Sequence, residues 1–268
     1  MVMCGIVGYV GQKDILSVLI VGLERLSYRG YDSAGVAVVS DDEISIWKRT
    51  GKVHVLAKEL ETKNSDATIG IGHTRWATHG IPNEVNAHPH FDAKRRFSIV
   101  HNGIIENYLQ LKSELIKEGF LFRSQTDSEV IVHLVDKYYN GSLIDAVKLA
   151  VQRLEGSFAF CVVSAFNSDC MLVARKNSPL IIGVGEKENY VSSDVNAIIP
   201  HTKKVIYLMI ILLHKLALKI LRFTILMGKS YLINYLMFIG ILSDQRKMDM
   251  TFLCKKKFMN NHRLFVLS

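Results

Sequence analysis

The chain has 268 residues, 49% of them hydrophobic, so it is long and apolar enough for one large or two small globular domains. Its formal net charge of +8 is confined to one end, because residues 1–205 hold 23 Lys+Arg and 23 Asp+Glu whereas residues 206–268 hold 10 and 2. The body is therefore neutral, and we expect no nucleic-acid partner and no membrane partner. The four cysteines show no C-x-x-C spacing, which indicates reduced thiols in a cytosolic protein.

Strand-like and helix-like patterns alternate along the body, which predicts a layered domain of strands and helices with largely antiparallel pairing. Asp14 is expected to cap the first helix, and Thr126 or Asp127 the third, with Glu129 in its first turn. Strands are expected at 5–10, 34–39, 44–48, 68–72, 97–101, 157–165, 170–175, 180–184 and 189–192. Helices are expected at about 15–26, 106–118, 128–139 and 142–154.

The first strand directly follows Cys4, in the run Met3-Cys4-Gly5. If the residues before Cys4 are removed, one residue carries both a thiol and an α-amine, whose ordinary pKa of ~7.7–8.0 suits it to act as the base for its own thiol. The alternative is a buried strand cysteine. Because Met1 and Val2 precede Met3, the mechanism requires either a start at Met3 followed by its removal, or cleavage of a longer leader.

Two polar clusters suit the binding of charged groups. Residues 73–80 read H-T-R-W-A-T-H-G, and Arg75 at a strand end suits a carboxylate clamp because a guanidinium engages both oxygens at once. A surface arginine beside a packed tryptophan is the alternative. Farther along, Asp127 is a helix cap, a ligand for an ammonium group, or both.

Two further motifs are relevant to catalysis. In residues 101–107, H-N-G-I-I-E-N, the pair Asn102-Gly103 offers a side-chain amide and a backbone N–H toward one point, as an oxyanion hole needs; a hairpin turn is the alternative. Residues 86–90, N-A-H-P-H, hold two histidines, but no acidic or cysteine partner lies at ligand spacing. We therefore expect no metal site and no cofactor.

These motifs, with Cys4 to Gly8 and the turn R-G-Y-D-S-A-G at residues 29–35, resemble the glutaminase domain of the glutamine–fructose-6-phosphate aminotransferase family over residues 3–208. The resemblance implies an α+β N-terminal-nucleophile hydrolase fold, a four-layer αββα sandwich that is incomplete at its C-terminal end. It implies that Cys4 attacks the side-chain amide of glutamine and that Asn102 and Gly103 hold the oxyanion. It further implies that fructose 6-phosphate binds in sugar-isomerase domains that are expected to be absent from this chain, and full-length members are expected to be homo-oligomeric.

The resemblance also assigns residues to the substrate and to the loop around the nucleophile. The α-carboxylate of glutamine is expected on Arg75, with Thr78 and His79 nearby, and the α-ammonium on Asp127. Trp76 is expected to help gate the passage of ammonia, and Arg29 to support the loop around Cys4.

Residues 209–268 are interpreted as an aberrant basic, apolar tail. Charged residues interrupt the apolar run, so that no stretch reaches the ~18–20 uncharged residues of a membrane span. Read from the third base of each codon, residues 248–262 permit G-Y-D-x-F-M-Q-K-E-I-Y-E-Q-P, which resembles the linker into the isomerase half of the family. A shifted reading frame near Leu208 predicts a poorly ordered tail and a sheet edge or apolar face left uncovered.

Three other interpretations stay open. In the first, the chain is an inactive truncated gene product. In the second, it is a stand-alone N-terminal-cysteine amide hydrolase for another substrate. In the third, it is a membrane-surface or interaction protein that uses its tail. Arg75 and Asp127 argue against the second, because together they suit a zwitterionic amino acid.

Overall fold

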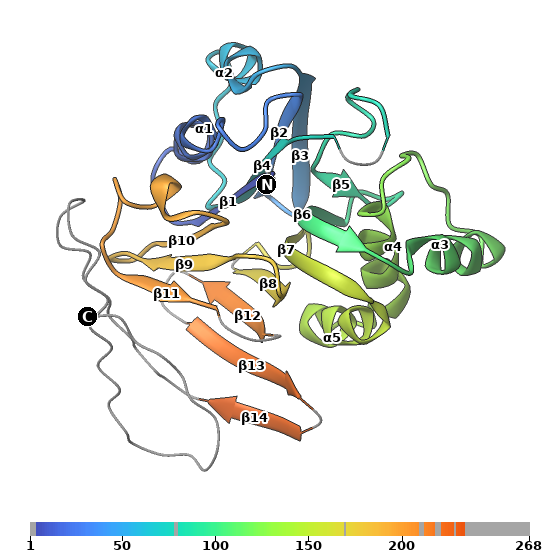
Figure 1. Cartoon of the computed structure of the whole chain (residues 1–268). Helices are drawn as coiled ribbons and strands as arrows, with labels where there is room; N and C mark the ends of the chain where they lie inside the picture. The colour runs from blue at the N-terminus through green and yellow to red at the C-terminus, as the bar shows by residue number, and fades with distance from the viewer. Residues whose placement is uncertain are drawn as a thin grey trace.

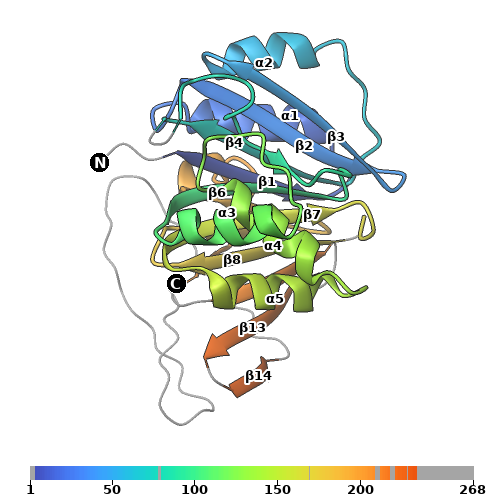
Figure 2. The same cartoon turned by 90° about the vertical axis from the view of Figure 1, so that its right-hand side faces the viewer.

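Two sheets are stacked face to face in a computed structural model of the chain, and helices cover both outer faces (Figures 1 and 2). The structure describes residues 4–77, 80–168, 170–208, 212–217, 221–227 and 229–233, the last three segments as backbone. Within the described strands, neighbours in each sheet pair antiparallel. The expected four-layer αββα sandwich is confirmed.

The first sheet has the strand order β11-β9-β10-β1-β4-β2-β3. Its central strand, β1, pairs with β10 on one side and β4 on the other, which places Cys4 at the end of an interior strand. The strands are β1 (Gly5–Val10), β2 (Ser33–Ser40), β3 (Glu43–Thr50), β4 (Ile69–Arg75), β9 (Ile181–Val184), β10 (Asn189–Ser192) and β11 (Val205–Tyr207).

The second sheet has the order β14-β13-β12-β8-β7-β6-β5. The pair β6 and β7 is the longest register in it and runs from Phe97↔Ser164 to Ile105↔Gly156. The strands are β5 (His90–Phe91), β6 (Phe97–Ile105), β7 (Gly156–Ser164), β8 (Cys170–Lys176), β12 (Leu212–Ala217), β13 (Leu221–Met227) and β14 (Lys229–Ile233).

Alternation along each strand divides the apolar side chains between two faces. On β1, Ile6 and Val10 face the second sheet, where they meet Cys161 of β7 and Met171 of β8 in the central core. The intervening Val7 and Tyr9 of β1 pack under the outer helices of the first sheet. Since both faces are buried, β1 reads as a continuous apolar run and is held firmly from both sides.

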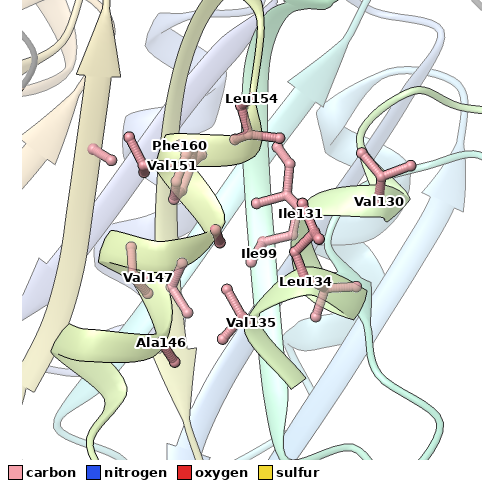
Figure 3. Close-up of a cluster of buried hydrophobic side chains, with 14 of the residues drawn as sticks. Ile99, Val130, Ile131, Leu134, Val135, Ala146, Val147, Val151, Leu154 and Phe160 are labelled. Atoms are coloured by element: carbon pink, nitrogen blue, oxygen red, sulfur yellow. The ribbon is translucent and has the colours of Figure 1, made fainter. Parts of the chain in front are cut away.

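Helices form the two outer layers. Those on the first sheet are α1 (Ile15–Arg25) and α2 (Val53–Leu60); those on the second are α3 (Tyr108–Lys117), α4 (Glu129–Tyr138) and α5 (Leu143–Arg153), and a short 3₁₀ helix covers Val195–Ala197. Figure 3 shows Ile131 and Leu134 of α4 and Val147 of α5 pointing toward Ile99 of β6 and Phe160 of β7. This buried cluster fixes the helices on the sheet that carries Asn102.

The expected strands and helices of the body are present with shifted ends, but α2, the two short strands β5 and β11 and the 3₁₀ helix were missed. The helix α2 was missed although Val53, Leu56 and Leu60 recur at helical spacing and are buried. The three-residue strand β11 was too short to stand out from the apolar run that continues beyond it.

One of the two expected helix caps is confirmed in position, and the other is wrong. Asp14 occupies the N-cap position of α1 but accepts no backbone N–H there, and its carboxylate instead contacts the hydroxyl of Ser17. The N-cap of α4 is Ser128, so neither Thr126 nor Asp127 caps that helix, because the side chains of both bind elsewhere. Glu129 does lie in the first turn of α4.

The expectation for the tail is corrected in one respect. The edge of β8 is not left uncovered, because β12 pairs with it from Leu212↔Arg175 to Ala217↔Cys170, and β13 and β14 extend the sheet. A sequence rich in Ile, Phe and Tyr has high strand propensity, and an open strand edge is a template for such pairing. The other expectation, that the tail is poorly ordered, concerns residues 209–268, which lie largely outside the described residues, 234–268 among them.

Among the described residues, no helix combines the length and the apolar character that crossing a membrane requires.

Candidate active site

The thiol of Cys4 lies against the main chain of Trp76. The Trp76 N–H donates to Cys4 Sγ at 3.2 Å, and the thiol donates back to the Trp76 carbonyl oxygen at 3.5 Å. Burial raises the pKa of Cys4 above its ordinary value, and the Trp76 N–H and the nearby charge of Arg75 only partly oppose this. The thiol is therefore protonated at neutral pH, and a nucleophilic role requires a base close to Sγ.

A cavity of about 480 Å³ opens beside this thiol, within the range of about 300–1,000 Å³ typical of small-molecule sites. Both sheets and the segment before α4 contribute to it. Its lining includes Cys4, Arg29, Arg75, Trp76, His88, His101, Asn102, Gly103, Ile104, Glu106, Thr126, Asp127, Ser128, Ser157, Ser178 and Pro179.

The pair Asn102-Gly103 faces Cys4 from β6, on the opposite sheet. The Asn102 side-chain amide donates from Nδ2 to the Cys4 carbonyl oxygen at 2.9 Å. Gly103 has φ +122°, and a Cβ there would lie 2.0 Å from the Ser157 carbonyl oxygen, so only glycine fits. The hairpin-turn alternative is wrong, because both residues lie within a nine-residue strand.

Arg75 ends β4 and is buried, so the alternative of a surface arginine is wrong. Its guanidinium donates to the carbonyl oxygen of Gly80 at 3.2 Å and lies 3.5 Å from that of Ile81. The Trp76 ring meets Tyr31 edge-on at 4.9 Å between centroids, and both Arg75 and Trp76 line the cavity. The two other residues expected near the substrate carboxylate, Thr78 and His79, lie outside the described residues.

Asp127 lines the same cavity as Arg75 and is buried. Its Oδ2 accepts the backbone N–H of Ile105 at 2.8 Å, and its Oδ1 accepts the Ser128 hydroxyl at 3.4 Å. Asp127 therefore fastens the segment before α4 to β6, next to Asn102. The role of Asp127 as a helix cap is excluded. Its role as a ligand for an ammonium group stays a prediction.

Arg29 contacts the main chain of the nucleophile. Its Nε donates to the Cys4 carbonyl oxygen at 3.2 Å, and its Nη1 forms an ion pair with Asp194 Oδ2 at 3.0 Å. The Cys4 carbonyl therefore accepts two hydrogen bonds, from Arg29 and from Asn102.

Four histidines are buried beside the site. His88 stacks on His73 at 4.2 Å between centroids and meets His90 edge-on at 4.5 Å, and His88 Nδ1 accepts the backbone N–H of His101 at 3.1 Å. His90 Nε2 lies 2.9 Å from Thr126 Oγ1. Burial lowers the pKa of all four. The part of the chain that the structure describes holds no group of three or more His, Cys, Asp or Glu side chains arranged to bind a metal ion.

Sequence reasoning assigned no role to three residues that hold the site together. Asp32 accepts the backbone N–H of Ala77 directly after Trp76, Asp194 pairs with Arg29, and His73 contacts Asn102. Asp32 and His73 lie inside the motifs at residues 29–35 and 73–80, and this was the signal that could have pointed to them. No motif near Asp194 indicated a role for it, because its partner Arg29 is 165 positions away in the sequence.

A second cavity, of about 580 Å³, lies among Lys48, Phe91 and Arg123. Burial lowers the pKa of Lys48 there to about 8. The described residues that line it include no thiol or hydroxyl, so the cavity at Cys4 is the stronger candidate for catalysis.

Comparison with known proteins gives the following matches. A family model described as a glutamine amidotransferase domain matches residues 59–220. The chain is 54% identical over 206 residues to glutamine–fructose-6-phosphate aminotransferase (isomerizing) of Aquifex aeolicus, covering 77% of this chain and 35% of that protein. It is 48% identical over 208 residues to the protein of that name from Pyrococcus horikoshii, with coverages of 77% and 35%. The chain thus spans about a third of the length of these relatives.

Two solved structures share the fold. One is the allosteric regulatory enzyme of purine biosynthesis, with a TM-score of 0.74 at 25% identity over 84% of this chain and 50% of that chain. The other is glutamine phosphoribosylpyrophosphate amidotransferase from B. subtilis, with a TM-score of 0.67 at 24% identity over 88% of this chain and 50% of that chain. The N-terminal-nucleophile hydrolase fold expected from the sequence is therefore confirmed.

Proposed function

Because the chain belongs to the glutamine amidotransferase domain family, we propose that it hydrolyses glutamine to glutamate and ammonia through a thioester on Cys4. The observation that supports this most is that Cys4, the Asn102 amide, Arg75 and Asp127 line one cavity although four separate parts of the chain supply them. A thiol, an oxyanion donor, a cation and an anion are the groups that amide cleavage of an amino acid requires.

The first step needs Cys4 as the amino-terminal residue. The thiol proton passes to the freed α-amine while Sγ attacks the side-chain amide carbon of glutamine, and the raised pKa of Cys4 explains why an adjacent base is necessary. In the printed sequence three residues precede Cys4, so the proposal includes their removal.

The second step breaks the carbon–nitrogen bond. The tetrahedral oxyanion is stabilised by the Asn102 amide and the Gly103 N–H, and ammonia leaves with the proton held on the α-amine. Water then attacks the thioester with the amine as base, which releases glutamate and restores the thiol. The support for this assignment is the position of Asn102 Nδ2, which already donates to the main chain of the nucleophile.

Recognition of glutamine rests on two charges. The guanidinium of Arg75 binds the α-carboxylate and Asp127 binds the α-ammonium, with Thr78 and His79 beside the carboxylate. Both charged side chains are buried in the cavity wall, where an ion pair with a ligand is weakly screened. Trp76 lines the cavity and its main chain contacts Cys4 Sγ, and we assign it the gating of ammonia.

The acceptor of the ammonia is proposed from the relatives. Their names give fructose 6-phosphate as the acceptor, and this chain matches about a third of their length. We infer that this chain corresponds to the part that releases ammonia, and we assign the binding of fructose 6-phosphate to the remaining two thirds of those proteins.

The proposal is tested by measuring ammonia and glutamate released from L-glutamine by protein whose first residue is shown by intact mass to be Cys4. We expect the two products in equal amounts and none from Cys4→Ala. Cys161→Ala is the matched control, because it removes a buried thiol of the central core and is expected to keep full activity. Activity that persists in Cys4→Ala overturns the proposal.

A substrate series separates glutamine hydrolysis from general amide hydrolysis. Glutaramate lacks the α-ammonium and 4-aminobutyramide lacks the carboxylate, so both are expected to react far more slowly than L-glutamine. Equal rates on all three amides favour a stand-alone amide hydrolase in which Arg75 and Asp127 do not bind substrate.

A further inference from the structure

A chain of hydrogen bonds joins His73 on one sheet to the nucleophile through Asn102 on the other. His73 Nε2 lies 3.0 Å from Asn102 Oδ1 and 3.0 Å from the His101 carbonyl oxygen. At the far end of the same carboxamide, Asn102 Nδ2 lies 2.9 Å from the Cys4 carbonyl oxygen. His73 and Asn102 are both buried, and the two contacts of His73 Nε2 lie in the interior, where water does not compete for them.

The two carbonyl groups at the ends of this series of hydrogen bonds determine which atom donates and which accepts in each bond. A carbonyl oxygen only accepts hydrogen bonds, so the His101 carbonyl requires that His73 Nε2 carries a proton. An Nε2–H beside the carboxamide requires the oxygen of Asn102, not its nitrogen, on that side. Independently, the Cys4 carbonyl requires the NH₂ group of Asn102 on the other side, and the two requirements agree.

His73 is confined to this single tautomer. Its Nδ1 is buried and has no hydrogen-bond partner among the described residues, so a second ring proton there has no acceptor. The ring is stacked on His88 at 4.2 Å, and burial lowers the pKa of His73 to about 3. The imidazole is therefore neutral at physiological pH, with its one proton on the nitrogen that faces Asn102.

We propose that His73 is a positioning residue that locks the Asn102 carboxamide with its NH₂ group toward Cys4. One hydrogen of this NH₂ bonds to the Cys4 carbonyl, and the second is presented to the oxyanion. A rotated carboxamide directs its oxygen at the developing negative charge and repels it. The inference rests on the proposed function for its catalytic consequence, but the tautomer and the amide orientation are properties of the protein alone.

Three variants test the catalytic consequence. His73→Phe keeps a flat ring but has no N–H, whereas His73→Gln supplies an amide N–H close to the position of Nε2. We expect His73→Phe to lower kcat for glutamine by about 10- to 100-fold with KM changed by less than about twofold, since the loss appears only in the transition state. His73→Gln is expected to recover most of this loss. His54→Phe, the same substitution on the exposed surface of α2, is expected to keep full activity.

Nitrogen-15 NMR of histidine-labelled protein tests the tautomer without reference to activity. The His73 signals are assigned by their loss in His73→Gln. We expect a protonated Nε2 and an unprotonated Nδ1 that show no titration between pH 5 and 8. If His73→Phe does not fold, this spectrum and the contrast between His73→Gln and the shorter His73→Asn decide the question.

The possible results separate the two proposals. An unprotonated Nε2, or unchanged kcat in folded His73→Phe, overturns the positioning role. No ammonia from wild-type protein that begins at Cys4 overturns the proposed function, and the NMR result still decides whether His73 orients Asn102.

Discussion

At the scale of single residues, hydrogen bonds from two side chains hold the main chain of Cys4 at the cavity wall. The Cys4 carbonyl is fixed by Arg29 and Asn102, so the backbone of the nucleophile is held while its thiol stays at the cavity wall. The raised pKa of Cys4 means that fixing the residue does not itself activate it. Activation therefore depends on the α-amine, and positioning depends on the surrounding donors.

Gly103→Ala is predicted to lose both stability and activity. Its φ of +122° and the 2.0 Å approach of a Cβ to the Ser157 carbonyl oxygen force β6 and β7 apart. We expect the free energy of unfolding in urea to fall by about 3 kcal/mol, since the clash adds to backbone strain of about 1–3 kcal/mol. Gly141→Ala is the control, because φ is +102° there but nothing lies within 4 Å of a Cβ. Equal losses in both variants contradict the steric argument.

Asp127→Asn is predicted to weaken glutamine binding without disturbing β6. The asparagine retains an oxygen for the Ile105 N–H but loses the negative charge. We expect KM for glutamine to rise about 10- to 100-fold with little change in kcat, because a charged hydrogen bond contributes about 1.5–3 kcal/mol. Steady-state kinetics on glutamine and glutaramate measure this. An equal effect on glutaramate, which has no α-ammonium, shows that Asp127 does not bind that group.

At the scale of elements, hydrophobic periodicity was sufficient to locate most of the body. The strand β1 follows from its continuous apolar run, because both of its faces are buried, and the helices α4 and α5 follow from their apolar spacing, because they pack on the second sheet. The caps were harder, since Asp127 bonds to the distant Ile105 rather than to its own helix. The pairing of β12 with β8 was missed because strand pairing depends on which edge is open, which no local pattern reveals.

Ile131→Ala in α4 is predicted to destabilise the whole domain. Ile131 is fully buried in the cluster that holds α4 and α5 on β6 and β7. We expect a loss of about 2–5 kcal/mol in the free energy of unfolding, from the lost transfer energy and the cavity left behind. Urea denaturation measures this. Leu149→Ala on the exposed side of α5 is the control, with a change below about 0.5 kcal/mol; comparable losses contradict the assigned core.

At the scale of the whole molecule, the two sheets bring together motifs that the sequence keeps apart. Cys4, Arg75, Asn102 and Asp127 were identified as candidates from their chemistry and line one cavity. The contact between His73 and Asn102 could not be predicted, because it depends on how β4 of one sheet faces β6 of the other. The same stacking buries four histidines, which gives the molecule a pH dependence.

The free energy of unfolding is predicted to fall as the pH drops below about 6.5. His73, His88, His90 and His101 are held neutral because burial lowers their pKa, whereas in the unfolded chain each binds a proton near pH ~6.5. Each histidine contributes up to about 1.4 kcal/mol per pH unit while the pH lies between its two pKa values. Urea midpoints at pH 7.5 and 5.5 measure this. Equal midpoints contradict burial of neutral histidines.

The most direct test of the whole account compares two preparations that differ only before Cys4. One retains Met1 to Met3 and the other begins at Cys4, with both first residues verified by intact mass. The account predicts that only the second releases ammonia and glutamate from glutamine in equal amounts, and that it is inactivated by alkylation of its first residue. Equal glutamine hydrolysis by the preparation that retains Met1 to Met3 contradicts the claim that the α-amine of Cys4 is the base.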